Sequence, residues 1–146
     1  MDKNVYKEFN KYSKNFIREL IKNFDHISEF KIMFGLYKIL KTFNKKLPYK
    51  YFNLYIAIDF KSHIVTRDES FFMSDGFKPR AYTEFVDIIK REWVLLDNAN
   101  KNALWDHLNL LIYLSDKCSE YRKQKKLPPI EAVDDSIKEN DDECQV

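Results

Sequence analysis

Apolar residues recur with a helical period along the first part of the chain. Over residues 5–24 they fall on one face at a spacing of about 3.6 residues, as an amphipathic helix requires. The apolar positions are Val5, Phe9, Tyr12, Phe16, Ile17, Leu20, Ile21 and Phe24. The sequence therefore predicts a first helix over residues 5–24 that ends near Asp25 and His26.

A second helical pattern begins at Ser28, a suitable N-cap, and closes at the polar cluster of residues 44–46. Its apolar positions are Phe30, Met33, Phe34, Tyr37, Leu40 and Phe43. Gly35 inside this helix costs up to about 1 kcal/mol relative to alanine, so we expect it to mark close packing of a neighbouring helix. Pro48 suits the first turn of a short third helix, with Tyr51, Phe52, Tyr55 and Ile56 following it.

The middle of the chain, residues 59–78, has the least regular pattern. Residues 55–60 and 63–66 are each compatible with a short strand, but two strands alone would be marginally stable, so we favour helix and loop. A turn is predicted at residues 74–76. Pro79 then starts a fourth helix with Tyr82, Phe85, Val86, Ile89 and Trp93 on one face.

The helix that starts near Asn98 has the strongest apolar signal, and Asp97 or Asn98 can cap its first turn. Leu104, Trp105, Leu108, Leu111 and Ile112 fill one face, with Leu110 and Leu114 beside it. Apolar residues over more than half of the circumference are typical of the central helix of a bundle. The pattern continues through Cys118 and Tyr121 until Pro128 and Pro129 stop it.

These patterns predict an all-α fold, a compact bundle of four to six helices with an irregular middle loop. We expect residues 1–127 to form a single helical domain and residues 128–146 a disordered acidic tail, because residues 131–146 hold seven acidic side chains, one lysine and little to bury. With 12 Phe and 9 Tyr, the core would be filled mainly by rings. Only 2 glycines occur, which argues against a glycine-rich phosphate loop.

A basic ridge is predicted on the first helix, at spacings of three and four residues. Its members are Lys3, Lys7, Lys11, Lys14, Arg18 and Lys22, and a second basic cluster contains Arg122, Lys123, Lys125 and Lys126. Repeated cations of this kind suit polyanions or acidic protein surfaces, although a solvated face in a lysine-rich chain has the same pattern. The segment 131–146 carries a net charge of −6, so the total of +2 leaves +8 on residues 1–130. We hypothesise that the tail competes for the ridge.

Candidate catalytic chemistry is sparse. His26, His63 and His107 are too far apart for a local metal motif, and no Cys-X-X-Cys, serine elbow or P-loop occurs. His63 beside Arg67, Asp68 and Glu69 is the catalytic candidate by default. A residue in the position of Asp68 or Glu69 is more often the start of a helix or a partner for Arg67. We therefore expect no enzymatic activity, no cofactor and no metal.

No apolar run approaches the roughly 18 residues that span a bilayer, and residues 1–4 open a charged amphipathic segment. Cys118 and Cys144 make an unconvincing disulfide pair. We expect a soluble, intracellular protein without membrane insertion.

Two blocks in fixed order carry a family resemblance. The segment Ile64-Val65-Thr66-Arg67-Asp68-Glu69-Ser70-Phe71-Phe72-Met73, followed by residues 98–114 around Trp105, resembles short proteins of large nucleocytoplasmic DNA viruses (giant viruses). The resemblance covers roughly residues 16–114 and implies a viral origin and a helical fold, without an assigned activity.

The sequence thus favours a non-enzymatic viral binding or scaffolding protein that acts through protein–protein contacts in the virion or the replication compartment. The alternative is a sequence-independent nucleic-acid-binding accessory protein that uses the basic ridge. On either reading the partner is a viral or host protein or a nucleic acid, the location is the host cytoplasm or the virion, and the oligomeric state stays open.

Overall fold

The all-α prediction is confirmed. A computed structural model describes residues 4–75, 77 and 83–130, with residues 83–85 described by their backbone alone. Within these residues the chain forms helices and turns and no strand. The acidic segment 131–146, Lys3 and the predicted helix start at Pro79 lie outside the described residues.

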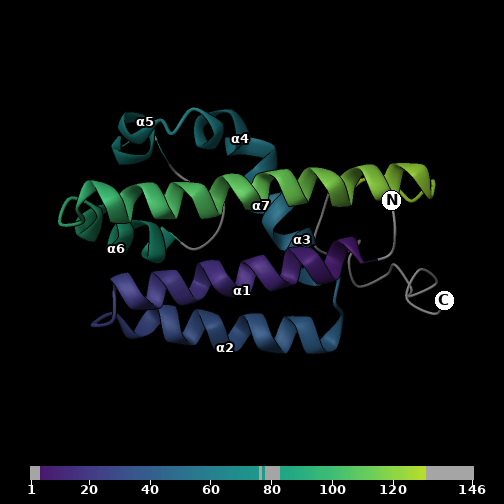
Figure 1. Cartoon of the computed structure of the whole chain (residues 1–146), viewed down its shortest axis with the longest axis horizontal. Helices are drawn as coiled ribbons and strands as arrows, with labels where there is room; N and C mark the ends of the chain where they lie inside the picture. The colour runs from purple at the N-terminus through teal and green to yellow at the C-terminus, as the bar shows by residue number, and fades with distance from the viewer. Residues whose placement is uncertain (1–3, 76, 78–82, 131–146) are drawn as a thin grey trace.

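A long helix, α7 (Asn98–Gln124), runs through the centre of the molecule. Helix α1 (Val5–Asn23) packs antiparallel along α7, and α2 (Ser28–Phe43) returns along the outer side of α1 (Figure 1). Helices α4 (Ile58–Val65) and α5 (Glu69–Met73) lie on the opposite side of α7 from α1, and α6 (Thr83–Trp93) lies near its N-terminal end. The helix with the most continuous apolar pattern is therefore the one with neighbours on several sides.

The middle segment is helix and turn, as the sequence favours. Helix α3 (Leu47–Phe52) carries Pro48 in its first turn, where proline has no backbone N–H to leave unpaired. It continues into a π-helical stretch, η1 (Asn53–Ala57), and then directly into α4. The runs that were compatible with strands therefore belong to a bent series of short helices.

Both ends of α7 have specific caps. The Asp97 carboxylate accepts a hydrogen bond from the Asn100 backbone N–H at 2.8 Å. At the other end Lys126 has a left-handed backbone with φ 58°, and the Leu127 N–H donates to the Arg122 carbonyl at 2.8 Å. This pattern satisfies the last carbonyls before Pro128.

Two expectations about α2 are wrong. Ser28 is the first helical residue and Ile27 holds the N-cap position, where no side chain caps the helix. Gly35 is exposed, and nothing would lie within 4 Å of a Cβ atom added to it, so it marks open surface instead of close packing.

The buried residues form three apolar clusters. The first joins the start of α1 to α3 and the end of α7, the second joins the end of α1 to α2, α6 and the start of α7, and the third lies beneath η1 and α4. Ile130 belongs to the first cluster at 5% exposure, so packed structure extends beyond residue 127.

Candidate functional site

Helix α2 carries a stripe of large apolar side chains in water. The stripe consists of Ile32, Leu36, Ile39 and Phe43, whose exposures are 58%, 49%, 65% and 76%. Steps of four, three and four residues place these side chains on one face. Single exposed apolar residues are ordinary on a protein surface, but a contiguous row of four is typical of an interaction surface. We refer to these residues as the apolar stripe.

The opposite side of α2 holds the helix to the protein. Phe30 is fully buried, and the Tyr37 hydroxyl donates to the Asn10 carbonyl of α1 at 2.5 Å. Burial raises the pKa of that hydroxyl, which keeps it a donor. The Asn10 side-chain amide in turn donates to the Lys45 carbonyl at 2.9 Å. The inner face of α2 is thus fixed by α1, and the apolar stripe faces away from it.

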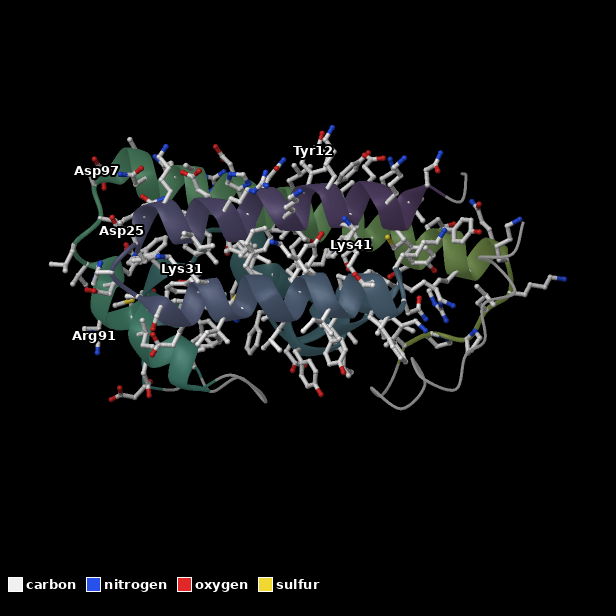
Figure 2. All side chains as sticks on the ribbon, turned by 90° about the horizontal axis from the view of Figure 1, so that it is seen from below. Tyr12, Asp25, Lys31, Lys41, Arg91 and Asp97 are labelled. Atoms are coloured by element: carbon white, nitrogen blue, oxygen red, sulfur yellow. The ribbon has the colours of Figure 1, made fainter. Side chains whose placement is uncertain are left out.

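Basic side chains lie on the side of α2 toward α1. Lys31, Lys38 and Lys41 of α2 are exposed, and Figure 2 shows Lys31 and Lys41 on the side of α2 that faces α1. The ring of Phe34 lies between two cations, 4.3 Å from Lys38 Nζ and 5.8 Å from Arg18 Cζ of α1. The basic side of α2 is therefore continuous with the basic ridge of α1.

The predicted ridge lies on the surface where the structure describes it. Lys7, Lys11, Arg18 and Lys22 are exposed and Lys14 is half-buried. Among the described residues no carboxylate lies within ion-pair distance of these five side chains. Together with Lys31, Lys38 and Lys41 they form a basic band that extends over α1 and the adjoining side of α2.

The second predicted basic cluster, at the end of α7, contains three exposed lysines and one buried arginine. Lys123, Lys125 and Lys126 are exposed at the end of α7, near the start of α1. Arg122 is 2% exposed, and its guanidinium donates to the Pro128 carbonyl at 2.8 Å and to the Tyr6 hydroxyl at 3.4 Å. Its inclusion in a surface cluster is wrong, because Arg122 follows Ser115 and Cys118 on the buried face of the helix.

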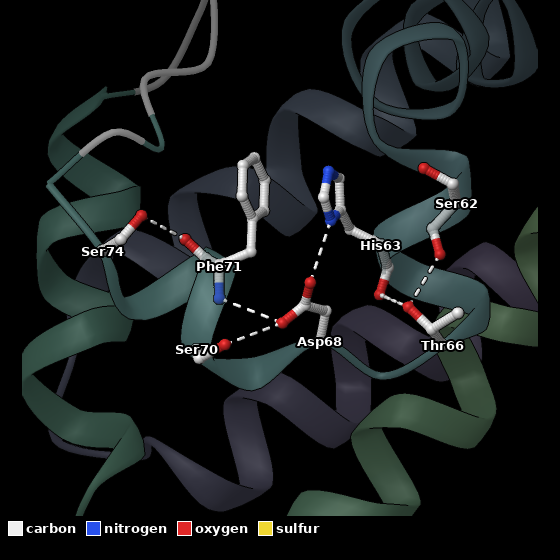
Figure 3. Close-up of polar contacts among 7 residues, drawn as sticks. All are labelled: Ser62, His63, Thr66, Asp68, Ser70, Phe71 and Ser74. Atoms are coloured by element: carbon white, nitrogen blue, oxygen red, sulfur yellow. Dashed lines mark hydrogen bonds and ion pairs between the residues drawn. The ribbon is translucent and has the colours of Figure 1, made fainter.

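The default catalytic cluster forms the cap of a short helix. Asp68 is the N-cap of α5, and its carboxylate accepts hydrogen bonds from the Phe71 N–H at 3.2 Å and the Ser70 hydroxyl at 2.9 Å (Figure 3). The other carboxylate oxygen lies 3.1 Å from His63 Nδ1. The imidazole stacks on the Phe71 ring with 3.6 Å between centroids. These contacts give Asp68 and His63 local structural roles.

The charged side chains of Arg67, Asp68 and Glu69 also have partners within the protein. Hydrogen bonds from Ser70, His63 and the Phe71 backbone lower the pKa of Asp68, so it stays a carboxylate. Glu69 accepts hydrogen bonds from the Trp93 indole and, at 3.0 Å, from Lys101, which lower its pKa. Arg67 pairs with Asp106 of α7 instead of with Asp68 or Glu69. The cluster thereby ties α5 to α6 and α7.

The other two histidines contact other parts of the molecule. His26 in the turn between α1 and α2 contacts Glu92 of α6, and the His107 ring lies 6.0 Å from the ring of Phe16. In the part of the chain that the structure describes, no three His, Cys, Asp or Glu side chains are grouped as metal ligands. Over the same residues, no helix combines the length and the apolar character needed to cross a bilayer.

Sequence reasoning found the basic ridge but missed the apolar stripe. The pattern places Phe30, Met33, Phe34, Tyr37, Leu40 and Phe43 on the apolar face of the second helix, but Phe43 is 76% exposed and belongs to the stripe, and Ile32, Leu36 and Ile39 are not among the predicted positions. A usable signal was present, because α2, like α7, has apolar residues on most sides. A helix that is apolar on most sides needs neighbouring elements on most sides. Helix α2 packs against α1 and α3 and has no neighbour on its outer face among the described residues.

The two blocks that resemble giant-virus proteins lie apart in the chain and have structural roles. The first forms the end of α4 and all of α5, and the second forms the first two thirds of α7. No family model, curated protein or solved structure matches this chain. The viral origin therefore stays a prediction.

Proposed function

We propose that this protein is a non-enzymatic binding protein that recognises another protein through α2. The observation that carries the proposal is the apolar stripe, four large side chains that are 49% to 76% exposed on one helical face. Covering such a row removes apolar surface from water at about 25 cal/mol per Å², which is the main driving force of most protein association. A role as a viral scaffolding component would use the same surface.

Charge determines the kind of partner that fits. Lys31 and Lys38 are exposed and directly precede Ile32 and Ile39 of the stripe, so two copies of this chain meeting face to face would bring such lysines together at an electrostatic cost. A different protein with an amphipathic helix, apolar on one face and acidic along its edge, would cover the stripe and neutralise the basic band. This arrangement is the helix-in-groove type of recognition, with anchors at spacings of three and four residues.

The second candidate function is sequence-independent binding of nucleic acid along the basic band. It is favoured by the exposure of Lys7, Lys11, Arg18 and Lys22, which have no carboxylate partner among the described residues. A phosphate backbone requires repeated cations and salt-dependent contacts, but it would leave the apolar stripe in water. The stripe therefore favours a protein partner.

The proposal is tested with a synthetic helical peptide that carries leucines at spacings of four, three and four residues and glutamates along one edge. Titration with a fluorescent label on the peptide should give saturable binding to the full chain. Replacing Ile32→Gln together with Ile39→Gln removes two apolar anchors and should weaken binding at least tenfold, or about 1.4 kcal/mol. The unfolding free energy should hardly change, because both side chains are exposed.

A matched control changes two exposed aliphatic residues elsewhere. Ile58 and Val65 on α4 are 55% and 52% exposed, so Ile58→Gln with Val65→Gln alters a similar area far from α2 and should leave peptide binding unchanged. A scrambled peptide of the same composition should bind weakly. Equal binding of both peptides would mean that the surface recognises only their negative charge, and would overturn the proposal.

Titration with mixed-sequence double-stranded DNA separates the second candidate. If DNA binds tightly, replacing Lys7, Lys11, Lys14 and Arg18 together with glutamine should reduce both its affinity and the slope of log K against log salt. Tight DNA binding by the Ile32→Gln, Ile39→Gln variant, combined with no peptide binding by the unmodified chain, would establish the second candidate in place of the first.

A further inference from the structure

The three apolar clusters surround a cavity of about 400 Å³ instead of merging into one core. Its walls include Leu111 from the first cluster, Trp105 from the second and Phe60 from the third. A domain of this size ordinarily has one contiguous core with smaller satellites. Residues that bridge two clusters, such as Phe16 and Phe72, also line the cavity, so the gap lies where the core would be joined.

The cavity is long. Its lining residues on α1 extend from Phe9 to Leu20, a distance of about 16 Å along the helix axis at 1.5 Å per residue. It ends near Pro48 in one direction and near Trp93 in the other, and Leu36, which is 49% exposed, lies on its α2 wall beside solvent. Its volume falls in the range of small-molecule sites, and an apolar cavity of about 150 Å³ already holds one benzene.

Several of the polar groups on the walls are engaged with other protein groups. The Tyr37 hydroxyl donates to the Asn10 carbonyl, Lys90 Nζ donates to the Ser74 carbonyl at 2.7 Å, and Glu69 accepts from Trp93 and Lys101. A polar ligand group inside would have to displace these contacts, and a buried polar group without a partner is costly. The contents that fit such walls are hydrocarbon.

We propose that this cavity binds one long hydrocarbon chain, of the kind found in fatty acids and membrane lipids. The length of the cavity favours a linear chain over a compact ring system, and the solvent-facing wall near Leu36 allows a polar head to remain in water. Each methylene that leaves water for these walls contributes favourably to binding. The cavity shares Leu36 with the apolar stripe, but Ile32, Ile39 and Phe43 of the stripe do not line it.

The chain contains its own reporter, because its only 2 tryptophans, Trp93 and Trp105, both line the cavity. The full chain is titrated with a 16-carbon fatty acid that carries bromine at mid-chain, since bromine quenches indole fluorescence on contact. Saturable quenching at one fatty acid per chain is expected, with a rise in Tm, because a ligand that binds only the folded state stabilises it. Absence of saturable quenching up to the solubility limit would overturn the proposal without any variant.

Two variants locate the binding. Val86→Phe with Ile89→Phe fills the α6 wall and should weaken chain binding at least tenfold, while Val94→Phe with Leu95→Phe makes matching changes at positions 62% and 76% exposed and should bind like the unmodified chain. The Ile32→Gln, Ile39→Gln variant should also keep chain binding. Loss of binding there, with binding retained in the filled variant, would place the chain on the apolar stripe and overturn the cavity site.

The source of the hydrocarbon chain is resolved by comparing free palmitate with a lysophospholipid that bears the same acyl chain. If both palmitate and the lysophospholipid displace the brominated probe, the hydrocarbon chain alone is recognised. If only one of them does, its head group is the one that fits at the opening of the cavity. Naphthalene should displace the probe poorly, because it fills only part of the long cavity. Displacement by naphthalene as effective as that by palmitate would overturn the linear-chain assignment.

Discussion

Helices α2 and α7 are both apolar around most of their circumference, yet only α7 is covered. On α7 the side chains of Leu104, Trp105 and Leu111 are 7% exposed or less, and among its large apolar residues only Tyr113 is strongly exposed. On α2 four large apolar side chains are about half exposed or more. Two helices with similar patterns thus have different surroundings.

The difference arises from position in the bundle. Helix α7 lies between α1 on one side and α4 and α5 on the other, whereas α2 packs against α1 and α3 and has water on its outer face. An apolar pattern therefore shows how much of a helix needs cover and does not show whether the same chain supplies it. Surplus apolar surface on a peripheral helix is an indication of a partner.

The largest expected effect is in the core of α7. Trp105→Ala removes a buried ring that contacts Trp93 and Phe72, with centroids 5.6 Å and 5.8 Å away, and should lower the unfolding free energy by about 3–5 kcal/mol. Phe43→Ala on α2 removes a ring that is 76% exposed and should change it by no more than about 0.5 kcal/mol. Urea unfolding followed by circular dichroism measures both, and equal losses would contradict the contrast between the two helices.

The fold was largely accessible from the sequence because its long helices carry strong periodic patterns. Residues 5–24, 28–43 and the helix from Asn98 to beyond Tyr121 were predicted almost to the residue. Asp97 was one of two predicted caps, and Asp68 was predicted as a possible helix start, since both precede apolar runs. Local chemistry determines these features, so the sequence displays them directly.

Features that depend on which helix faces pack against each other could not be predicted from the sequence. The position of Arg122 in a run of basic residues suggested surface, but its place one turn after Cys118 buries it against Tyr6. The apolar stripe and the cavity arise from how α2, α6 and α7 are arranged around α1, and no single helix contains that information. Arg67 likewise pairs with Asp106, which is remote in sequence.

A smaller effect is expected at the start of each helix. Asp97→Ala removes the carboxylate that caps α7 and should cost about 1 kcal/mol, within the range of about 0.5–2 for such caps. Ser28→Ala should be close to neutral, because no side chain caps α2. Urea midpoints measure both changes, and Asp97→Asn is the control, since asparagine also caps well. A cost for Ser28→Ala equal to that for Asp97→Ala would contradict the assigned helix starts.

The smallest expected effect concerns a contact that ties the start of α2 to α6. Hydrogen bonding to Glu92, with a weaker contribution from Asp25 at 3.7 Å, raises the pKa of His26 above its ordinary 6.5. Because the folded pKa is the higher one, the contribution to stability is complete below pH 6.5 and is lost as the pH rises through the folded pKa. Urea midpoints measured from about pH 5.5 to about pH 8.5 should therefore fall more steeply for the unmodified chain than for His26→Gln. Glu92→Gln should flatten the profile equally, since it removes the main cause of the shift, and a profile unchanged by either substitution would show that α2 is not held to α6 by this pair.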